Sequence, residues 1–214
     1  MKKIFTIALL SLFILSCKAQ TIVPQFGSGH TGVINYYYKD VDIFFNPYEG
    51  DWIYTNGNTS LKIRLLKKER VLFTNSLGSY YEDVLVGEYE YIENGILRIN
   101  TLNNLNINHI SSFNYNLYDL ARIRKNIYPL CPECATDEYR IKLNYNEPEY
   151  QNYQGFGSYM VIRKVVENGV EKLKLKFIEQ SREGFRAING DINNLEFITA
   201  NYKIPFGEYT LIKQ

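Results

Sequence analysis

The sequence predicts an all-β fold: a single antiparallel domain of about ten strands, built as a lipocalin-like barrel or a two-layer sandwich. Three stretches, at residues 47–67, 87–100 and 157–177, share one plan. In each, a Gly precedes an aromatic residue by two positions, an Asn-Gly turn follows, and the chain leaves on an alternating strand. Period-two alternation around Asn-Gly is the strongest short-range signal for a β-hairpin. Short strands at this spacing favour a barrel or sandwich over βαβ units.

The other strands follow from alternation between turn residues. Residues 33–45 predict one or two strands, which Asn46-Pro47 ends. On the strand at 80–92, Leu85, Tyr89 and Tyr91 share one face. Further short strands are expected at residues 71–73, 97–101, 139–143, 195–199 and 207–212.

Three segments between these strands predict other structure. Residues 102–108 are rich in Asn and predict a loop into a strand through Ile107 and Ile110. Apolar residues at 117–127 recur every three or four positions, which predicts a short helix. Proline is excluded from central strands, so the segment near 114–137 is expected to be the main mid-chain connection.

The N-terminus has the features of a secretory signal peptide at residues 1–16. Two lysines precede an apolar core at 4–15, which is too short for a comfortable membrane span. Residues 14–17, Ile-Leu-Ser-Cys, resemble the bacterial lipobox, in which a peptidase cuts before a cysteine whose thiol receives diacylglycerol. The resemblance predicts that Cys17 is lipidated. The alternative is an ordinary signal peptide cut after Ala19 or Gln20.

The predicted mature chain consists of a lipidated cysteine and tether at 17–32 and a β-rich domain at 33–214. The lipid on Cys17 would be the contact with a membrane. Surface-exported lipoproteins of Bacteroidota tend to carry acidic residues after this cysteine, whereas Lys18, Ala19 and Gln20 follow it here. That comparison favours an outer-membrane lipoprotein of the cell envelope on the periplasmic face.

Composition limits the classes of partner. The net charge is +1, and loss of Lys2 and Lys3 with the signal lowers it by two. A balance this close to neutral argues against a nucleic-acid partner. Aromatic residues make up 15% of the chain, with 19 Tyr. Tyrosine suits half-buried strand faces as well as surfaces on which a small-molecule or glycan ligand stacks.

Cys131 and Cys134 form a C-x-x-C motif that has three interpretations. A redox dithiol requires a thioredoxin-like βαβ context, which the sequence does not predict. A zinc site requires two more ligands, and the two histidines, His30 and His109, are distant in sequence. A local structural disulfide fits an oxidising compartment best. His109 alternates with Ile107 on the expected strand and is interpreted as a structural residue.

Carboxylates spaced two apart lie on one face of a strand, which is geometrically suited to glycoside hydrolysis. Asp40 with Asp42 and Glu88 with Glu90 have this spacing, and Glu82-Asp83 adds a third cluster. Solvated strand faces give the same pattern, and the sequence carries no nucleophile, metalloprotease or phosphate-binding motif. The sequence therefore predicts that the protein is not an enzyme and needs no cofactor or metal.

Five aromatic residues are candidates for a pocket or for the core: Trp52, Tyr54, Tyr89, Tyr91 and Tyr159. Trp52, Tyr89 and Tyr159 each follow the opening Gly of a hairpin by two positions, which predicts that they point into the same interior. Gly50-x-Trp52 resembles the G-x-W feature of lipocalin-like barrels, where the Trp packs against a basic side chain at the barrel floor.

The mature chain as a whole resembles an uncharacterised family of small Bacteroidota lipoproteins. The similarity rests on the Ile-Leu-Ser-Cys signal, on the Gly50-Asp-Trp52-x-Tyr54 hairpin and on the closing tail at 204–213, IPFGEYTLIK. No activity or site residue comes with that family. The leading hypothesis is a non-enzymatic envelope lipoprotein that binds a small apolar or glycan ligand, or acts as an interaction module. The alternatives are a periplasmic carboxylate-based hydrolase and a purely structural envelope component.

The N-terminal assignment predicts that Cys17 is the first residue of the mature protein and carries lipid. Mass spectrometry of the N-terminal peptide is expected to show the acylated cysteine, and Cys17→Ala is expected to release the protein from the membrane fraction. An unmodified N-terminus at Thr21, or a Cys17→Ala protein that still sediments with membranes, would contradict the assignment.

Overall fold

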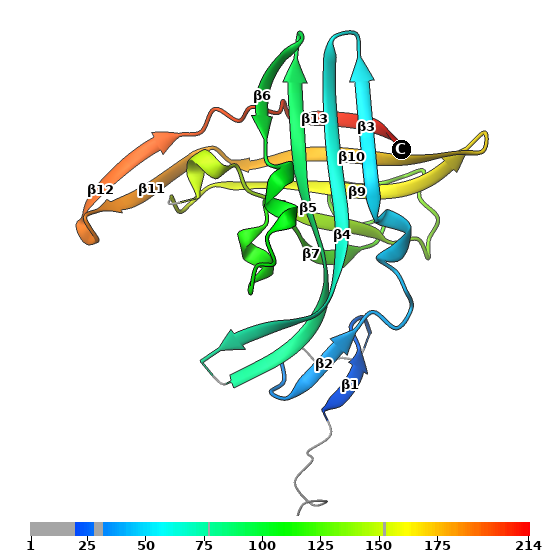
Figure 1. Cartoon of the computed structure of the whole chain (residues 1–214), viewed down its shortest axis with the longest axis horizontal. Coiled ribbons are helices and arrows are strands. Elements are labelled where there is room, and N and C mark those ends of the chain that lie inside the picture. The colour runs from blue at the N-terminus through cyan, green and yellow to red at the C-terminus, as the bar shows by residue number, and fades with distance from the viewer. Residues whose placement is uncertain (1–19, 28–31, 77, 152) are drawn as a thin grey trace, which may run out of the picture.

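The computed structural model describes residues 20–27, 32–76, 78–151 and 153–214, and its centre is a closed antiparallel β-barrel (Figure 1). The predicted signal peptide, Cys17 and His30 lie outside the described residues. Eight strands form the barrel. They are β3 (Gly50–Asn56), β4 (Thr59–Asn75), β5 (Gly78–Glu93), β7 (Leu117–Ile123), β8 (Arg140–Tyr145), β9 (Gly157–Glu167), β10 (Val170–Ser181) and β13 (Gly207–Lys213). The all-β prediction is confirmed, and of the two architectures the lipocalin-like barrel is the one observed.

The strands follow one another around the barrel in chain order, and β13 closes it against β3. Two segments leave this path. The strand β6 (Ile96–Asn100) folds back on β5, and β11 (Glu183–Ile188) with β12 (Asp191–Thr199) forms a separate two-stranded sheet. Figure 1 shows that this hairpin extends away from the barrel on one side. Among the described residues there is no helix with the length and apolarity needed to cross a bilayer.

The hairpin of β4 and β5 reaches beyond the barrel and bends there. A β-bulge interrupts the pairing between Lys68 and Val71, and Arg70 has a φ of 55°. Bulges bend the strand and increase its twist. The far end of the hairpin then pairs with β2 (Tyr36–Lys39), which is parallel to β1 (Thr21–Pro24). The short strand expected at 71–73 is therefore the far end of β4, and part of the expected tether at 17–32 forms β1.

The barrel interior is filled with side chains. Trp52, Ile63 and Tyr89 are direct cross-strand neighbours on β3, β4 and β5, and all three are completely buried. Direct neighbours share a face, so these residues form the centre of one hydrophobic core. Trp52 donates its indole N–H to the Tyr48 carbonyl oxygen at 2.7 Å.

The same core also contains Tyr91, with Tyr54 packed against it and partly exposed. The Lys213 ammonium lies 5.3 Å from the Trp52 ring centre.

Tyr159 does not join this interior, so the prediction for the third hairpin is wrong. Tyr159 packs with Ile123 and Val161 in a separate cluster on the other face of β9. The core positions of β9 are Met160 and Ile162. The third hairpin has a register shift between Glu179 and Ser181, beside its opening Gly. The extra residue of this shift is on β10, so β9 alternates without interruption and Gly157 and Tyr159 lie together on its outer face. The opening Gly of a hairpin therefore does not mark the same face in all three copies.

A strand replaces the helix that was predicted at 117–127. The strand β7 has a bulge between Asp119 and Ala121. The bulge exchanges the two faces, so that Leu117 lies in the barrel core and Ile123 on the outside. This exchange produces the helix-like spacing of apolar residues. The connection between β7 and β8 therefore comprises residues 124–139, whereas the sequence predicted it near 114–137.

The strand predicted through Ile107 and Ile110 is also absent. Residues 102–106 form a 3₁₀ turn, η2 (Leu102–Asn106), and Ile107 and Ile110 are 53% and 84% exposed. Backbone N–H groups at Asn104 and Ile107 donate to carbonyl oxygens three residues earlier. His109 consequently lies in an irregular segment, not on a strand. Three further 3₁₀ turns are η1 (Asn46–Tyr48), η3 (Ser112–Asn114) and η4 (Pro148–Tyr150).

The filled interior predicts a large stability loss for Trp52→Ala. Truncation of a fully buried aromatic residue costs about 3–5 kcal/mol, because the cavity it leaves closes only in part. Denaturant unfolding measures this loss, and Phe197→Ala, at a ring that is 71% exposed, is the control. The indole fluorescence of the native protein is expected to be blue-shifted. A loss below about 1 kcal/mol, or emission typical of indole in water, would contradict the core assignment.

Candidate functional site

The candidate site is a groove of about 830 Å³ on the outside of the barrel. One side comes from the excursion between β5 and β7, at residues 100–116, and the other from the segment 144–158 with Tyr202. Thr101 fixes the excursion to the barrel, since its hydroxyl donates to the Tyr89 carbonyl oxygen and accepts from the Tyr89 N–H. We call this the amide–aromatic groove, because its lining is mostly Asn, Gln and aromatic residues.

The aromatic side of the groove is a connected set of rings around η4. The ring of Tyr150 lies 4.9 Å from that of Phe156 and 5.7 Å from that of Tyr202. The ring centres of Tyr153 and Phe156 are 6.0 Å apart, and those of Tyr145 and Tyr202 are 5.9 Å apart. Aromatic pairs at these separations attract one another and limit ring motion. Across the groove, Phe113 is 57% exposed.

The amide side of the groove is organised by Glu88, which is completely buried on β5. Its carboxylate accepts hydrogen bonds from the side-chain amides of Asn104 and Asn116, both at 2.6 Å, and from the Asn116 backbone N–H at 3.0 Å. An ionised carboxylate only accepts, so it fixes which end of each amide faces it. The remaining Asn104 oxygen lies 2.7 Å from Nε2 of His109, which therefore carries the proton of this bond.

Glu147 is the carboxylate in the groove lining. Burial raises the pKa of Glu147, while the backbone N–H of Lys203 and the hydroxyl of Tyr145 lower it by hydrogen bonding. Burial also raises the pKa of Tyr145 well above its usual value, with Tyr89 and Glu147 adding to the effect. The Tyr145 hydroxyl, 3.1 Å from Glu147, stays protonated and acts as its donor. Among the described lining residues there is no Lys or Arg.

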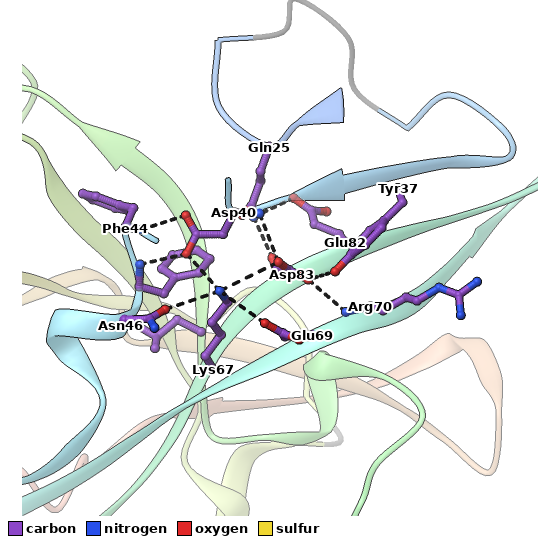
Figure 2. Close-up of polar contacts among 12 residues, drawn as sticks. Gln25, Tyr37, Asp40, Phe44, Asn46, Lys67, Glu69, Arg70, Glu82 and Asp83 are labelled. Atoms are coloured by element: carbon purple, nitrogen blue, oxygen red, sulfur yellow. Dashed lines mark hydrogen bonds and ion pairs between the residues drawn. The ribbon is translucent and has the colours of Figure 1, made fainter. Parts of the chain in front are cut away.

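A second polar cluster lies where the β4–β5 hairpin bends (Figure 2). Asp83 accepts from the Tyr37 hydroxyl at 2.6 Å and from the backbone N–H groups of Asp40 and Arg70 at 3.0 and 2.9 Å. Asp40 accepts from the N–H groups of Phe44 and Phe45 at 2.8 and 3.0 Å. Both aspartates are buried. Their acceptor sites are thus used to fasten β2 and the following loop to the bulge.

Lys67 supplies the positive charge of this cluster from the barrel side. Its ammonium lies 3.3 Å from Asp40 and 3.9 Å from Asp83, and the side chain is only 8% exposed. Glu82 lies at the edge, where its pKa is raised by burial and lowered by the hydrogen bond from Gln25. A buried ion pair held by several hydrogen bonds is typical of a structural junction. The contacts of this cluster therefore give no support to a catalytic carboxylate pair.

The carboxylates that the sequence paired have different surroundings in the structure. Asp42 is exposed while Asp40 is buried, and Asp40 meets Asp83 from a different strand. Glu88 lies beneath the groove, whereas Glu90 accepts from the Asn100 amide at its rim. Sequence reasoning missed Glu88 as a groove residue, and it missed the amides as well. The Asn-rich run at 103–108 and the repeated Asn at 144 and 146 were the signal that pointed to them.

Cys131 and Cys134 are joined by a disulfide in the connection between β7 and β8. Arg140 shapes the same connection, because its guanidinium donates to the carbonyl oxygens of Arg124, Ile127 and Pro129 at 2.6–2.9 Å. The disulfide and the Arg140 hydrogen bonds both lie in this connection, which supports a structural role for the C-x-x-C motif. No group of three or more metal-ligand side chains occurs in the part of the chain that the structure describes.

Fold and groove together define a closed lipocalin-like barrel with a filled interior and an external amide–aromatic groove. The whole chain, residues 1–214, matches the model of a family of unknown function, DUF6705, and the protein belongs to that family. The predicted resemblance to an uncharacterised family is thereby confirmed. No curated protein and no solved structure gives a significant match.

The junction at the hairpin bend predicts that Asp83→Ala destabilises the fold by about 3–5 kcal/mol, because it leaves the Tyr37 hydroxyl and two backbone N–H groups without their acceptor and removes one carboxylate from beside Lys67. Asp42→Ala, at an exposed aspartate two residues from Asp40, is the control and is expected to cost less than about 0.5 kcal/mol. Urea unfolding of both variants tests the assignment, which equal stability of the two would overturn.

Proposed function

We propose that this protein is a non-enzymatic lipoprotein of the cell envelope whose amide–aromatic groove binds a neutral glycan. The envelope location rests on the signal-like N-terminus and the lipobox resemblance, which together favour anchoring in the outer membrane through Cys17. The binding role rests on the groove. The observation that carries it is the combination of connected aromatic rings on one side and oriented amides on the other.

Sugars match this combination of groups. A pyranose has apolar C–H faces, which pack on aromatic rings, and a rim of hydroxyls, which pair with amide groups. Ligand sites are commonly concave, with a few polar groups at fixed positions. The groove has these properties, whereas the barrel interior is occupied by Trp52, Tyr89 and their neighbours. The site therefore favours a glycan over an apolar ligand inside the barrel.

Hydrolysis is the competing proposal, and the positions of the carboxylates favour it less. A glycosidase needs two carboxylates facing the bond, about 5–10 Å apart. The described groove lining contains one, Glu147, whose oxygens accept from Tyr145 and Lys203. Glu88 is enclosed beneath the two asparagines. These partners give both carboxylates structural roles.

Binding of neutral hexasaccharides to the mature protein in detergent micelles tests the proposal. Cellohexaose, mannohexaose and chitohexaose are suitable probes for calorimetry. At least one is expected to bind, and Phe113→Ala is expected to weaken it about tenfold, because an aromatic contact contributes on the order of 1 kcal/mol or more.

Tyr128→Ala, at a ring that is 66% exposed and outside the groove lining, is the matched control and is expected to bind like the wild type. Equal affinity of the two variants for the sugar would reject the groove as the binding site. Release of shorter sugars would favour the hydrolase, and absence of binding to the whole panel would favour a purely structural envelope component.

A further inference from the structure

We infer that the buried carboxylate of Glu88 makes the amide–aromatic groove selective for uncharged glycans and excludes glycans that carry carboxylate, sulfate or phosphate groups. This inference rests on the proposed glycan-binding function and specifies its ligand class. It follows from two properties of the described groove residues: the direction in which the amides point and the sign of the charge around them.

Four asparagines of the groove direct amide N–H groups toward other protein groups. Asn104 and Asn116 donate to Glu88, Asn100 donates to Glu90 at 2.5 Å, and Asn144 donates to Asn146 at 2.8 Å. Asn104 also donates to the carbonyl oxygen of Asn114 at 3.0 Å, so both of its N–H groups are used. The oxygen of Asn104 accepts from His109 and that of Asn116 from Gln151, so each keeps a second lone pair, which requires a hydrogen-bond donor on the ligand.

Sugar hydroxyls are donors, whereas ionised carboxylate, sulfate and phosphate oxygens are acceptors only. An anionic group against the oxygens of Asn104 or Asn116 would lose its hydration without gaining hydrogen bonds. The hydroxyl of a neutral sugar satisfies the same oxygens directly. At these two oxygens the hydrogen-bond pattern thus favours the neutral ligand class.

The charged side chains around the groove also disfavour an anionic ligand. Glu88 lies beneath the groove and Glu147 in its lining, and among the described lining residues neither Lys nor Arg offsets them. Lys203 approaches Glu147, but its ammonium lies 2.9 Å from Glu149, outside the lining. Arg186, which stacks on Tyr153, has its guanidinium 2.6 Å from Glu196. Carboxylates screened by little water repel an anion more strongly than surface carboxylates do.

Matched ligand pairs test the inference on the full lipidated chain in detergent. Cellohexaose is paired with the glucuronate hexamer, mannohexaose with the mannuronate hexamer, and the methyl-esterified galacturonate hexamer with its free acid. The neutral member is expected to bind at least about tenfold more tightly than its anion. Failure of every neutral sugar to bind would reject the proposed function. Binding of a neutral sugar with equal affinity for its anion would reject only the selectivity.

Two substitutions locate the source of the selectivity. Glu88→Gln keeps the shape of the side chain, removes its charge and turns one amide around, so the ratio of neutral to anionic affinity is expected to fall at least about threefold. Glu93→Gln, on the same strand and paired with Arg98 on the surface, should leave the ratio unchanged. A folded Glu88→Gln protein with the wild-type ratio would overturn the inference.

Gln151→Lys tests the charge argument without altering the core, since Gln151 is exposed in the groove lining. The added ammonium is expected to lower the ratio, while Gln214→Lys at the C-terminus, outside the lining, should not. An unchanged ratio in Gln151→Lys would overturn the inference even if Glu88→Gln does not fold. Because the ratio compares two ligands on one protein, a general loss of stability does not alter it.

Discussion

The register of β5 is the constraint on which most of the structure depends. One face of this strand carries Leu85, Tyr89 and Tyr91 into the barrel core. The opposite face carries Glu88 beneath the groove, where Asn116 covers it. At the hairpin bend, Asp83 of the same strand accepts from the backbone N–H of Asp40. A shift of one residue would exchange all these positions at once. The pairing of β5 with β4 over most of its length prevents that shift, because every pair must move together.

Burial of Glu88 is the unfavourable part of this arrangement, and the asparagines compensate for it. A carboxylate loses much hydration when it leaves water, and it is stable in the interior only when its oxygens are hydrogen-bonded. Asn104 and Asn116 supply those bonds from the excursion between β5 and β7. The same bonds hold the excursion against the barrel. Groove shape and charge burial are therefore two results of a single set of contacts.

The sequence was sufficient for the fold class and for the hairpins because both depend on local signals. Alternation and Asn-Gly turns predicted β3–β4, β5–β6 and β9–β10, and they placed Trp52 and Tyr89 on core-facing positions. One error occurs where a bulge changes the alternation, and another where the face of a strand is set by tertiary packing. The segment from Leu117 to Ile123 was misplaced for the first reason, since a bulge is a tertiary adjustment with a weak local signature. Tyr159 was misplaced because the opening Gly of the third hairpin lies on the outer face of β9, and no local signal distinguishes the two faces.

The groove was harder to predict than the fold, because its two sides come from distant parts of the chain. Tyr150 and Asn104 line the same groove, but no periodicity links them. The choice among carboxylates also required the structure. In the sequence, nothing distinguishes the three acidic residues Asp40, Asp83 and Glu88. Their hydrogen-bond partners show that the two aspartates belong to the junction and that Glu88 lies beneath the groove.

The last step in forming the barrel is set by where its closing strands lie in the chain. Around the barrel most neighbouring strands are also neighbours in sequence, but β3 meets β13, with Ile53 opposite Ile212. Contacts between such distant residues are slow to form. A chain still emerging during synthesis can assemble its hairpins one by one, yet Trp52 stays beside an open seam until the C-terminal strand arrives. The barrel is thus completed only after β13 has been synthesised, and until then its core is open to competing partners.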